Sequence, residues 1–350
     1  MPDQPLLDRE RPTLDLGALQ AWLGDRLGDP SVPLTAEPLG ADLGMGNALF
    51  ELRRADEVWV LRRPPAVLND KSASNMVREY RILRALDGSS VPHPVARALG
   101  EDPGIIGAPF LIMDKVDGFT PGFVLPEPFN SDPGLRRGLA MAYVDALVDL
   151  AEVDWQAGGL ADLGKPDGFL ERQVSRWLAQ LDRYRVRDLP ELDFLTDWLE
   201  RSRPAMSKPG IMHGDYSPFN VMVAPGPPAR LAAVIDWDTG TIGDPLLDIG
   251  HLLARWTNPG EEPVLQLQAG GTDHYPTRAE MAARYAERSG RDLSALPYYE
   301  ALALFKLAVI LEGTYARKHK AGVPDAEILM FELVPRLTRA AAAFARGERP

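Results

Sequence analysis

The spacing of apolar residues changes about one third of the way along the chain. Before that point, apolar runs bounded by glycine, proline or polar turns predict β-strands, at 48–52, 58–62, 95–99 and 109–116. Apolar residues recur at helical spacing from Leu16 to Leu27 and again over 70–87. The pattern therefore predicts a small, mainly β N-terminal part that also contains two helices.

Beyond residue 117 the pattern is mainly helical. Helices are expected at about 135–155, 168–184, 191–203, 245–256, 277–289, 296–318 and 325–345. Short strands are expected near 210–213, 219–223 and 231–236. The stretch 117–134 is rich in glycine and proline and separates the two patterns. We therefore expect an N-terminal nucleotide-binding lobe of residues 1–116 and a C-terminal catalytic and substrate-binding lobe of residues 117–350.

Composition narrows the class of protein. A chain of 350 residues with 45% hydrophobic and 25% charged residues can bury a large core. The absence of cysteine excludes disulfides, thiolate metal sites and a cysteine nucleophile. A net charge of −12 opposes binding to nucleic acid. The polar N-terminus and the lack of a long apolar segment lead us to expect a cytoplasmic protein without membrane contact.

Two polar clusters stand at the ends of the predicted short strands. His213-Gly214-Asp215 follows one strand, Asn220 comes five residues after Asp215, and Asp236 ends a later strand. Transfer of a phosphoryl group to a hydroxyl needs one carboxylate that accepts or orients the hydroxyl proton. It also needs oxygen ligands that hold magnesium against the phosphates. The plain alternative is that His-Gly-Asp and Asn220 are turn residues.

These residues resemble the catalytic signature of the aminoglycoside phosphotransferase family, relatives of the eukaryotic-like protein kinases. The resemblance implies an α+β, bilobal protein-kinase-like fold, with a small five-stranded antiparallel lobe, a larger mainly helical lobe, and ATP and Mg²⁺ between them. It implies Asp215 as the catalytic base and Asn220 and Asp236 as metal ligands, with His213 and Asp238 in support.

The segment Gly243-Asp244-Pro245-Leu246-Leu247-Asp248 also resembles that family. Asp244 is a good helix N-cap and Pro245 suits a first helical turn. The resemblance implies that Asp248 braces the catalytic loop by hydrogen bonds. We expect both aspartates to act as scaffold rather than in catalysis.

In the N-terminal part, Arg62 ends a strand that precedes the helix carrying Glu79. Kinases place a lysine at this position over the nucleotide phosphates and pair it with a helix glutamate. Arginine keeps the charge with a different geometry. Arg63 competes for the role, but strand alternation lets only one of the two face the nucleotide. The alternative interpretation makes both arginines a solvated edge and Glu79 a surface carboxylate.

Two further segments are weaker candidates for nucleotide contact. Gly44 and Gly46 resemble a shortened phosphate-covering turn, although glycines in a hairpin are more often simple turn residues. The stretch from Met113 to Lys115 occupies the position of the interlobe hinge in the family, where backbone groups would meet the adenine.

The phosphate acceptor stays open. Leu61-Arg62-Arg63-Pro64-Pro65 resembles the kinase-like domains fused to acyl-CoA dehydrogenases, which implies a hydroxylated acyl thioester. A small metabolite alcohol is slightly preferred over an aminoglycoside 3′-type antibiotic kinase. A basic run at 317–320 either complements the end of a helix or attracts an anionic acceptor.

Two functions of other classes remain as alternatives: a non-catalytic nucleotide-binding pseudokinase and a metal-dependent hydrolase. No histidine spacing suits zinc.

Overall fold

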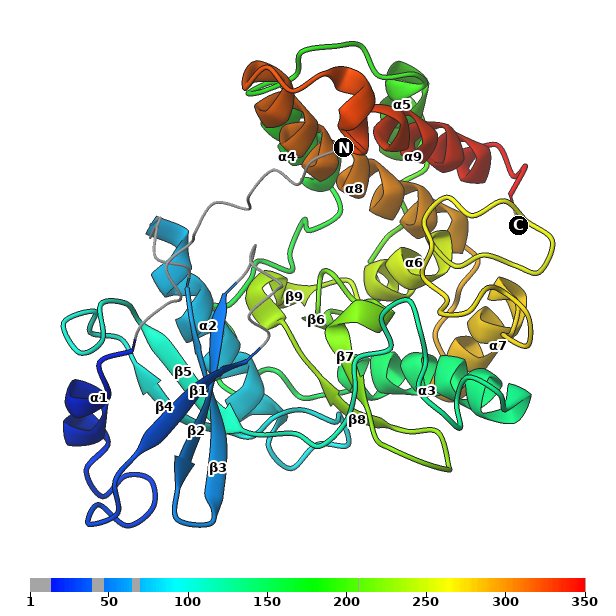
Figure 1. Cartoon of the computed structure of the whole chain (residues 1–350). Coiled ribbons are helices and arrows are strands. Elements are labelled where there is room, and N and C mark those ends of the chain that lie inside the picture. Colours follow the sequence, from blue (N-terminus) through cyan, green and yellow to red (C-terminus); the bar gives the residue numbers. More distant parts are fainter. Residues whose placement is uncertain (1–13, 40–46, 65–69, 207, 350) are drawn as a thin grey trace, which may run out of the picture. The chain divides into compact units, whose positions relative to one another are not determined.

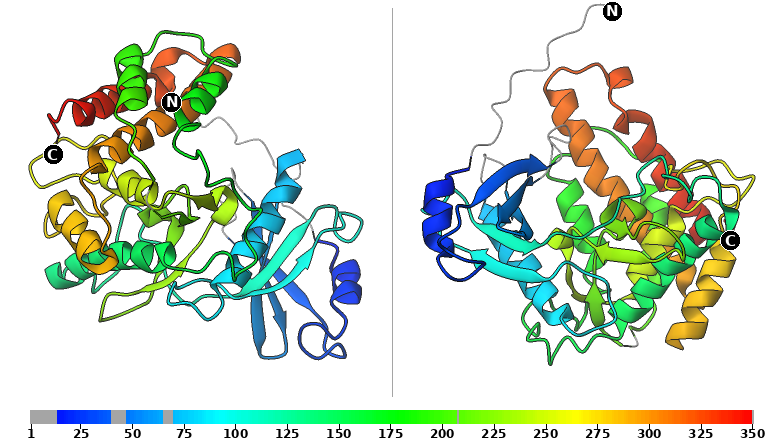
Figure 2. Two further views of the ribbon diagram at one scale, coloured as in Figure 1. Left: turned by 180° about the vertical axis from the view of Figure 1, so that it is seen from behind. Right: turned by 60° about the horizontal axis from the view of Figure 1, so that its bottom comes forward.

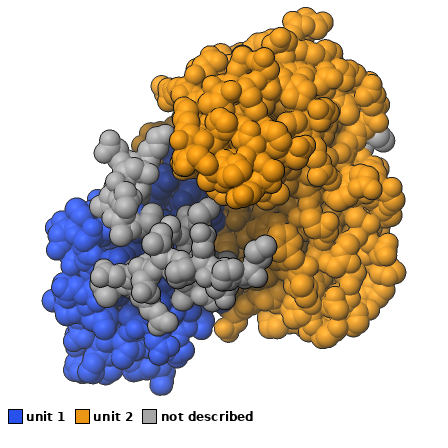
Figure 3. Space-filling view, turned by 45° about the horizontal axis from the view of Figure 1, so that its top comes forward, with its two compact units in different colours: residues 1–87, 93–116, 236–238 blue, residues 88–92, 117–235, 239–350 orange. Residues whose placement is uncertain are grey.

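The computed structural model describes residues 14–39, 47–64, 70–206 and 208–349 (Figure 1). The chain forms two compact units, coloured separately in Figure 3. The first unit comprises residues 1–87, 93–116 and 236–238, and the second comprises 88–92, 117–235 and 239–350. The assignment of nucleotide binding and catalysis to two lobes that meet at residue 117 stays a prediction.

The described part of the first unit contains a five-stranded antiparallel sheet with strand order β1-β2-β3-β5-β4. Its strands are β1 (Thr35–Leu39), β2 (Ala48–Arg54), β3 (Glu57–Arg63), β4 (Ala96–Gly100) and β5 (Phe110–Asp114). Because side chains alternate across a strand, Leu61 and Arg62 of β3 lie on opposite faces of the sheet. The predicted antiparallel sheet is confirmed.

Two helices accompany this sheet. α1 (Leu16–Leu23) packs Leu19 and Leu23 into one core with Phe50 and Leu61. It ends four residues before the predicted end at Leu27, because Gly24 takes a left-handed φ of 48°. α2 (Asp70–Leu86) contacts β4 and β5 and carries Glu79.

The second unit is mainly helical, as predicted. Its helices are α3 (Pro133–Ala151), α4 (Gln173–Leu181), α5 (Leu192–Arg201), α6 (Leu246–Ala254), α7 (Arg278–Ser289), α8 (Leu296–Lys320) and α9 (Met330–Ala345). The long α8 packs along α9 and against α6, and α3 packs against α7 (Figures 1 and 2). No helix in the described ranges is long and apolar enough to cross a bilayer.

Two short antiparallel ribbons in this unit position the polar clusters. β6 (Gly210–Met212) pairs with β9 (Thr241–Gly243), and β7 (Val221–Val223) pairs with β8 (Leu231–Val234). Residues 219 and 220, which we expected to begin a strand, belong to the 3₁₀ turn η1 (Pro218–Asn220) instead. Pro218 lacks the N–H that a strand ladder uses, and this favours the turn.

Candidate active site

The predicted catalytic segment follows β6 and is held by α6. The backbone N–H groups of His213 and Gly214 donate to the carboxylate of Asp248 at 2.6 and 2.9 Å. Asp248 is 2% exposed, and a buried carboxylate is stable only where donors surround it. The structure thus places Asp248 directly beneath the loop that carries Asp215.

Gly214 allows this loop to turn. Its φ is +81°, and a Cβ atom there would lie 2.8 Å from the carbonyl oxygen of Thr239. Any other residue would therefore be strained and would also collide with backbone. The buried ring of His213 donates from Nε2 to the carbonyl oxygen of Ile235 at 2.9 Å, which ties the loop to the end of β8.

Asp215 and Asn220 are joined by two hydrogen bonds. Nδ2 of Asn220 donates to the backbone oxygen of Asp215 at 2.8 Å and approaches its Oδ2 at 3.3 Å. With the amide nitrogen turned toward Asp215, Oδ1 of Asn220 is the atom left for another partner. An amide oxygen is one of the hard donors that magnesium accepts.

The carboxylate of Asp215 is half exposed, and Nε2 of His251 lies 3.1 Å from its Oδ1. Burial alone would raise the pKa of Asp215. The hydrogen bond with His251 and the charge of Arg255 outweigh this and hold the pKa of Asp215 below its ordinary value. Asp215 is therefore ionised at neutral pH.

Two cationic side chains of the second unit also bind the loop. Nη2 of Arg255, at the end of α6, donates to the carbonyl oxygen of Tyr216 at 2.8 Å. Nζ of Lys306 on α8 donates to the carbonyl oxygen of Gly214. Burial lowers the pKa of Arg255 to about 10, so the guanidinium is charged at neutral pH and favours the ionised form of Asp215.

Asp244 connects two helices rather than reaching the loop. Its Oδ1 accepts from the backbone N–H of Leu246 at 3.1 Å, and its Oδ2 accepts from the hydroxyl of Tyr299 at 2.7 Å. These bonds tie the start of α6 to α8. Asp244 therefore has the contacts of a structural residue.

In the first unit, Arg62 gathers three carboxylates. Nη1 donates to Glu79 at 3.0 Å, and Nη2 donates to Asp236 at 2.6 Å and to Asp238 at 3.0 Å. Asp236 adopts a left-handed φ of 66°, which is uncommon outside glycine and clusters at functional sites. The side chain of Asp236 is 45% exposed, so its carboxylate remains accessible to a ligand.

The interpretation of this region as a solvated edge is wrong. Arg62, Arg63 and Glu79 are all buried in the structure. Arg63 donates to the carbonyl oxygen of Ile106 at 3.1 Å and lies over the ring of Phe50. Strand alternation thus assigns Arg62, and not Arg63, to the face of Glu79 and the two aspartates.

Four further residues were predicted to contact the nucleotide, and two of them are described by the structure. Gly44 and Gly46 lie outside the described residues. Met113 pairs with Val60 in the β3–β5 ladder. Lys115 places its Nζ 2.5 Å from Glu51, so its side chain already has a partner and only its backbone could meet a base.

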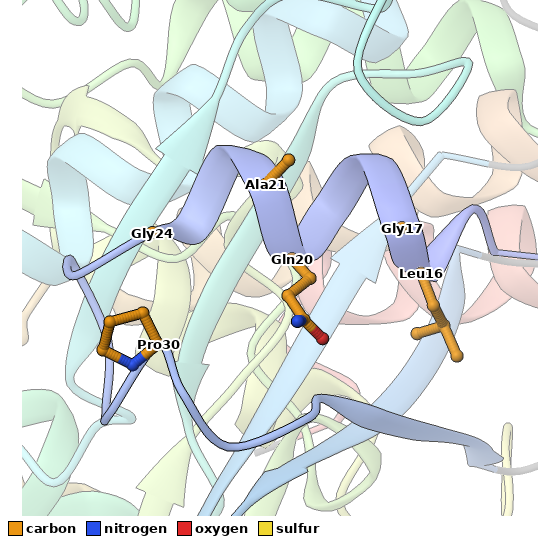
Figure 4. Close-up of a pocket in the computed structure, with 6 residues that line it drawn as sticks. All are labelled: Leu16, Gly17, Gln20, Ala21, Gly24 and Pro30. Atoms are coloured by element: carbon orange, nitrogen blue, oxygen red, sulfur yellow. The ribbon is translucent and has the colours of Figure 1, made fainter.

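Two surface hollows lie apart from these residues. One, of about 440 Å³, runs along α1 (Figure 4) and is lined by Leu16, Gly17, Gln20, Ala21, Gly24 and Pro30. The other, of about 560 Å³, has Lys208, Arg291 and Tyr299 among its lining residues. Neither contains a predicted site residue.

Sequence reasoning missed His251, Arg255 and Lys306. His251 follows Asp248 by three residues and Arg255 follows by four more, so the three share one face of α6. This spacing could have indicated that His251 and Arg255 lie on the same side of α6 as Asp248, toward the predicted catalytic loop. Lys306 is a single charge within the apolar run 301–310, which also marks a position that needs explanation.

Comparison with known proteins identifies the class. Residues 39–284, more than half of the chain, match the model of the APH family, described as the phosphotransferase enzyme family. A structure from Ralstonia eutropha, assigned as an aminoglycoside phosphotransferase, is 30% identical, covers 96% of this chain and 99% of its own, and superposes with a TM-score of 0.80. The chain belongs to the APH phosphotransferase family, and the predicted kinase-like α+β fold is confirmed.

The curated relatives are longer proteins. Acyl-CoA dehydrogenase family member 10 of Mus musculus is 31% identical over 86% of this chain and 28% of its own length. Family member 11 of Rattus norvegicus is 30% identical over 87% of this chain and 39% of its own length. The chain therefore spans less than half of these relatives. The predicted resemblance to their kinase-like portions is confirmed.

A more distant solved structure shares the fold. The ternary complex of aminoglycoside phosphotransferase APH(4)-Ia with ADP and hygromycin B has a TM-score of 0.59, covers 95% of this chain and 99% of its own, and is 14% identical. At this identity the likeness concerns the fold alone.

Proposed function

We propose that this chain transfers the γ-phosphoryl group of ATP, with Mg²⁺, to a hydroxyl group of a small molecule. The observation that carries the proposal is the half-exposed carboxylate of Asp215, ionised and hydrogen-bonded through Oδ1. The acceptor oxygen would attack the γ-phosphorus, the bond to the β-phosphate oxygen would break, and Asp215 would receive the hydroxyl proton. A carboxylate with a lowered pKa is a weak base, so it orients the hydroxyl first and takes the proton late.

Asn220 and Asp236 would hold Mg²⁺ through oxygen atoms, and the ion would screen the charge of the phosphates when bound. Among the described residues no group of three or more His, Asp or Glu side chains could hold a metal alone. In the proposed site, substrate phosphates would supply the rest of the coordination. The first unit, with Arg62 beside Asp236, would bind the nucleotide, and the second would bind the acceptor.

The charge near Asp215 favours a neutral or anionic acceptor. Arg255 and Lys306 donate to carbonyl oxygens of the loop and offset the charges of Asp215 and Asp248, and Arg176 on α4 is a further, exposed cation. A polycationic aminoglycoside needs carboxylates instead. Together with the acyl-CoA dehydrogenase relatives, this supports a hydroxylated metabolite, including a hydroxyacyl thioester, as acceptor.

The test is a screen for ADP release from MgATP, repeated with MgGTP, over hydroxylated acids, hydroxyacyl thioesters and aminoglycosides. We expect turnover with at least one acceptor and a loss of about 10²-fold or more in Asp215→Ala, with nucleotide binding kept in a thermal-shift titration. Nucleotide binding without turnover on any acceptor would instead identify a pseudokinase. Phosphate release without an acceptor would identify a hydrolase.

A further inference from the structure

His251 is a buried histidine whose ring meets the catalytic carboxylate. It lies on α6, three residues after Asp248, and is 4% exposed. Its Nε2 stands 3.1 Å from Oδ1 of Asp215. α6 therefore contacts the loop twice, through the carboxylate of Asp248 on the backbone and through the ring of His251 on the side chain of Asp215.

The direction of this hydrogen bond follows from its chemistry. An ionised carboxylate can only accept, so Nε2 of His251 must carry the proton. Burial and the neighbouring Arg255 hold the ring neutral, with the pKa of His251 lowered to about 3. The ring is thus a neutral donor with its proton on Nε2, and it adds no charge beside the base.

The backbone that carries the ring is tied to the loop. Nε of Arg255 donates to the carbonyl oxygen of His251 at 3.0 Å, while Nη2 of the same guanidinium donates to Tyr216 at 2.8 Å. One planar side chain therefore couples the end of α6 to the residue after Asp215. Because a guanidinium holds its donors in a rigid fork, the distance between His251 and the loop has little freedom.

We propose that His251 is a positioning residue that selects the rotamer of Asp215 by donating to Oδ1. Oδ2, which Nδ2 of Asn220 approaches at 3.3 Å, then directs its second lone pair toward the acceptor hydroxyl. This inference rests on the proposed function. Packing alone would not call for a histidine here, since nearby residues of α6 are apolar and fully buried, among them Ile249, Leu252 and Leu253, all 0% exposed. A buried imidazole costs free energy unless it is hydrogen-bonded, and its partner is a half-exposed carboxylate.

The contact can be tested without catalysis. Long-range ¹H–¹⁵N NMR of ligand-free protein with ¹⁵N-labelled histidine reports which ring nitrogen carries the proton, and the variant His251→Gln assigns the signal. We expect the neutral Nε2–H form at neutral pH, and a shift of the Nε2 signal in Asp215→Ala. A proton on Nδ1, or an Nε2 signal that ignores Asp215→Ala, overturns the proposal.

The catalytic consequence is tested with a matched pair of variants. Glutamine can place an amide N–H near the position of Nε2, whereas leucine has a similar size and no donor. With MgATP and the acceptor that turns over best, we expect His251→Leu to lower kcat about tenfold or more at an unchanged KM for MgATP, because a misplaced base loses alignment. His251→Gln should recover most of the loss. His274→Gln, in an exposed turn of the second unit, serves as the control that keeps kcat.

Each failure has a different meaning. If the wild-type chain turns over no acceptor, the proposed function falls and the role of His251 in it falls too. If the wild type is active and His251→Leu keeps its kcat, only the positioning role is overturned. If both His251 variants lose kcat equally while melting at the wild-type temperature, the donor is not what matters, and the proposal is also overturned.

Discussion

Nη1 of Arg62 donates to Oε1 of Glu79 at 3.0 Å, and the two residues are 8% and 2% exposed. The pair joins β3 to α2. Burial raises the pKa of Glu79, and the guanidinium of Arg62 opposes that rise. The carboxylate of Glu79 therefore depends on Arg62 for its charged state.

Removing Arg62 alone should be costly for stability. Arg62→Met leaves a buried carboxylate without its counter-charge, and we expect the free energy of unfolding to fall by about 3 kcal/mol. The double variant Arg62→Met/Glu79→Leu should recover part of this, because an apolar pair replaces Arg62 and Glu79, while Asp236 and Asp238 still lose their counter-charge. Urea denaturation measures all three, with Arg53→Met, on the neighbouring strand and half exposed, as the control. A double variant as unstable as the single one would contradict the expectation.

Arg62 should also matter for nucleotide in a way that lysine cannot reproduce. Its guanidinium reaches Glu79 with one nitrogen and Asp236 and Asp238 with the other, whereas lysine offers a single ammonium. We expect Arg62→Lys to raise the Kd for MgATP about tenfold, measured by isothermal titration calorimetry. Arg53→Lys should leave the Kd unchanged. Equal affinity in wild type and Arg62→Lys would remove Arg62 from the nucleotide site.

Gly214 should resist substitution for two separable reasons. Gly214→Ala would meet Thr239 at 2.8 Å and would also adopt a positive φ. Gly159 has a φ of +72° and nothing within 4 Å of an added Cβ, so Gly159→Ala isolates the conformational cost of about 1 kcal/mol. We expect Gly214→Ala to be at least about 1 kcal/mol less stable than Gly159→Ala in thermal unfolding. Equal losses would show that the loop shifts away from Thr239 without strain.

The sequence predicted the presence of helices and strands better than their exact ends or the order in which the strands pair. Apolar spacing located α2, α6, α7 and α8 closely, because each buries a continuous stripe. It extended the helix over 168–184, whereas α4 covers only Gln173–Leu181, since the flanking turns also bury apolar residues. The sheet order, in which β5 lies between β3 and β4, depends on long-range pairing that local spacing does not encode.

In the candidate site, too, residues close together in the sequence could be predicted and residues far apart could not. Asp215, Asn220 and Asp248 lie within one loop and helix, and their order along the chain pointed to a shared site. Lys306 meets Gly214 across 92 positions of sequence, and only the packing of α8 on α6 brings them together. Residues that support a site from another element carry little local signal.

The stability of the second unit should fall as pH rises, through Glu300. This residue of α8 is 3% exposed, and burial raises its pKa to about 8, opposed by Arg278 and Arg349. Arg278 is already paired with Glu261 at 2.6 Å, so it offers Glu300 little compensation. Below the pKa of the unfolded chain, Glu300 is protonated in both states. Above it the unfolded chain releases a proton that the folded chain keeps until about pH 8, so unfolding becomes progressively easier over that window.

Glu300→Gln removes this dependence, because glutamine resembles the protonated carboxyl at every pH. We expect wild type and variant to be similarly stable at about pH 5, and the variant to be more stable by about 2 kcal/mol or more at about pH 9. Urea denaturation at both pH values measures the change, with the exposed Glu327→Gln as the control. If the stability difference is the same at both pH values, the pKa of Glu300 is not raised in the folded protein. The charges of Arg278 and Arg349 would then fully offset the effect of burial, contrary to the expectation.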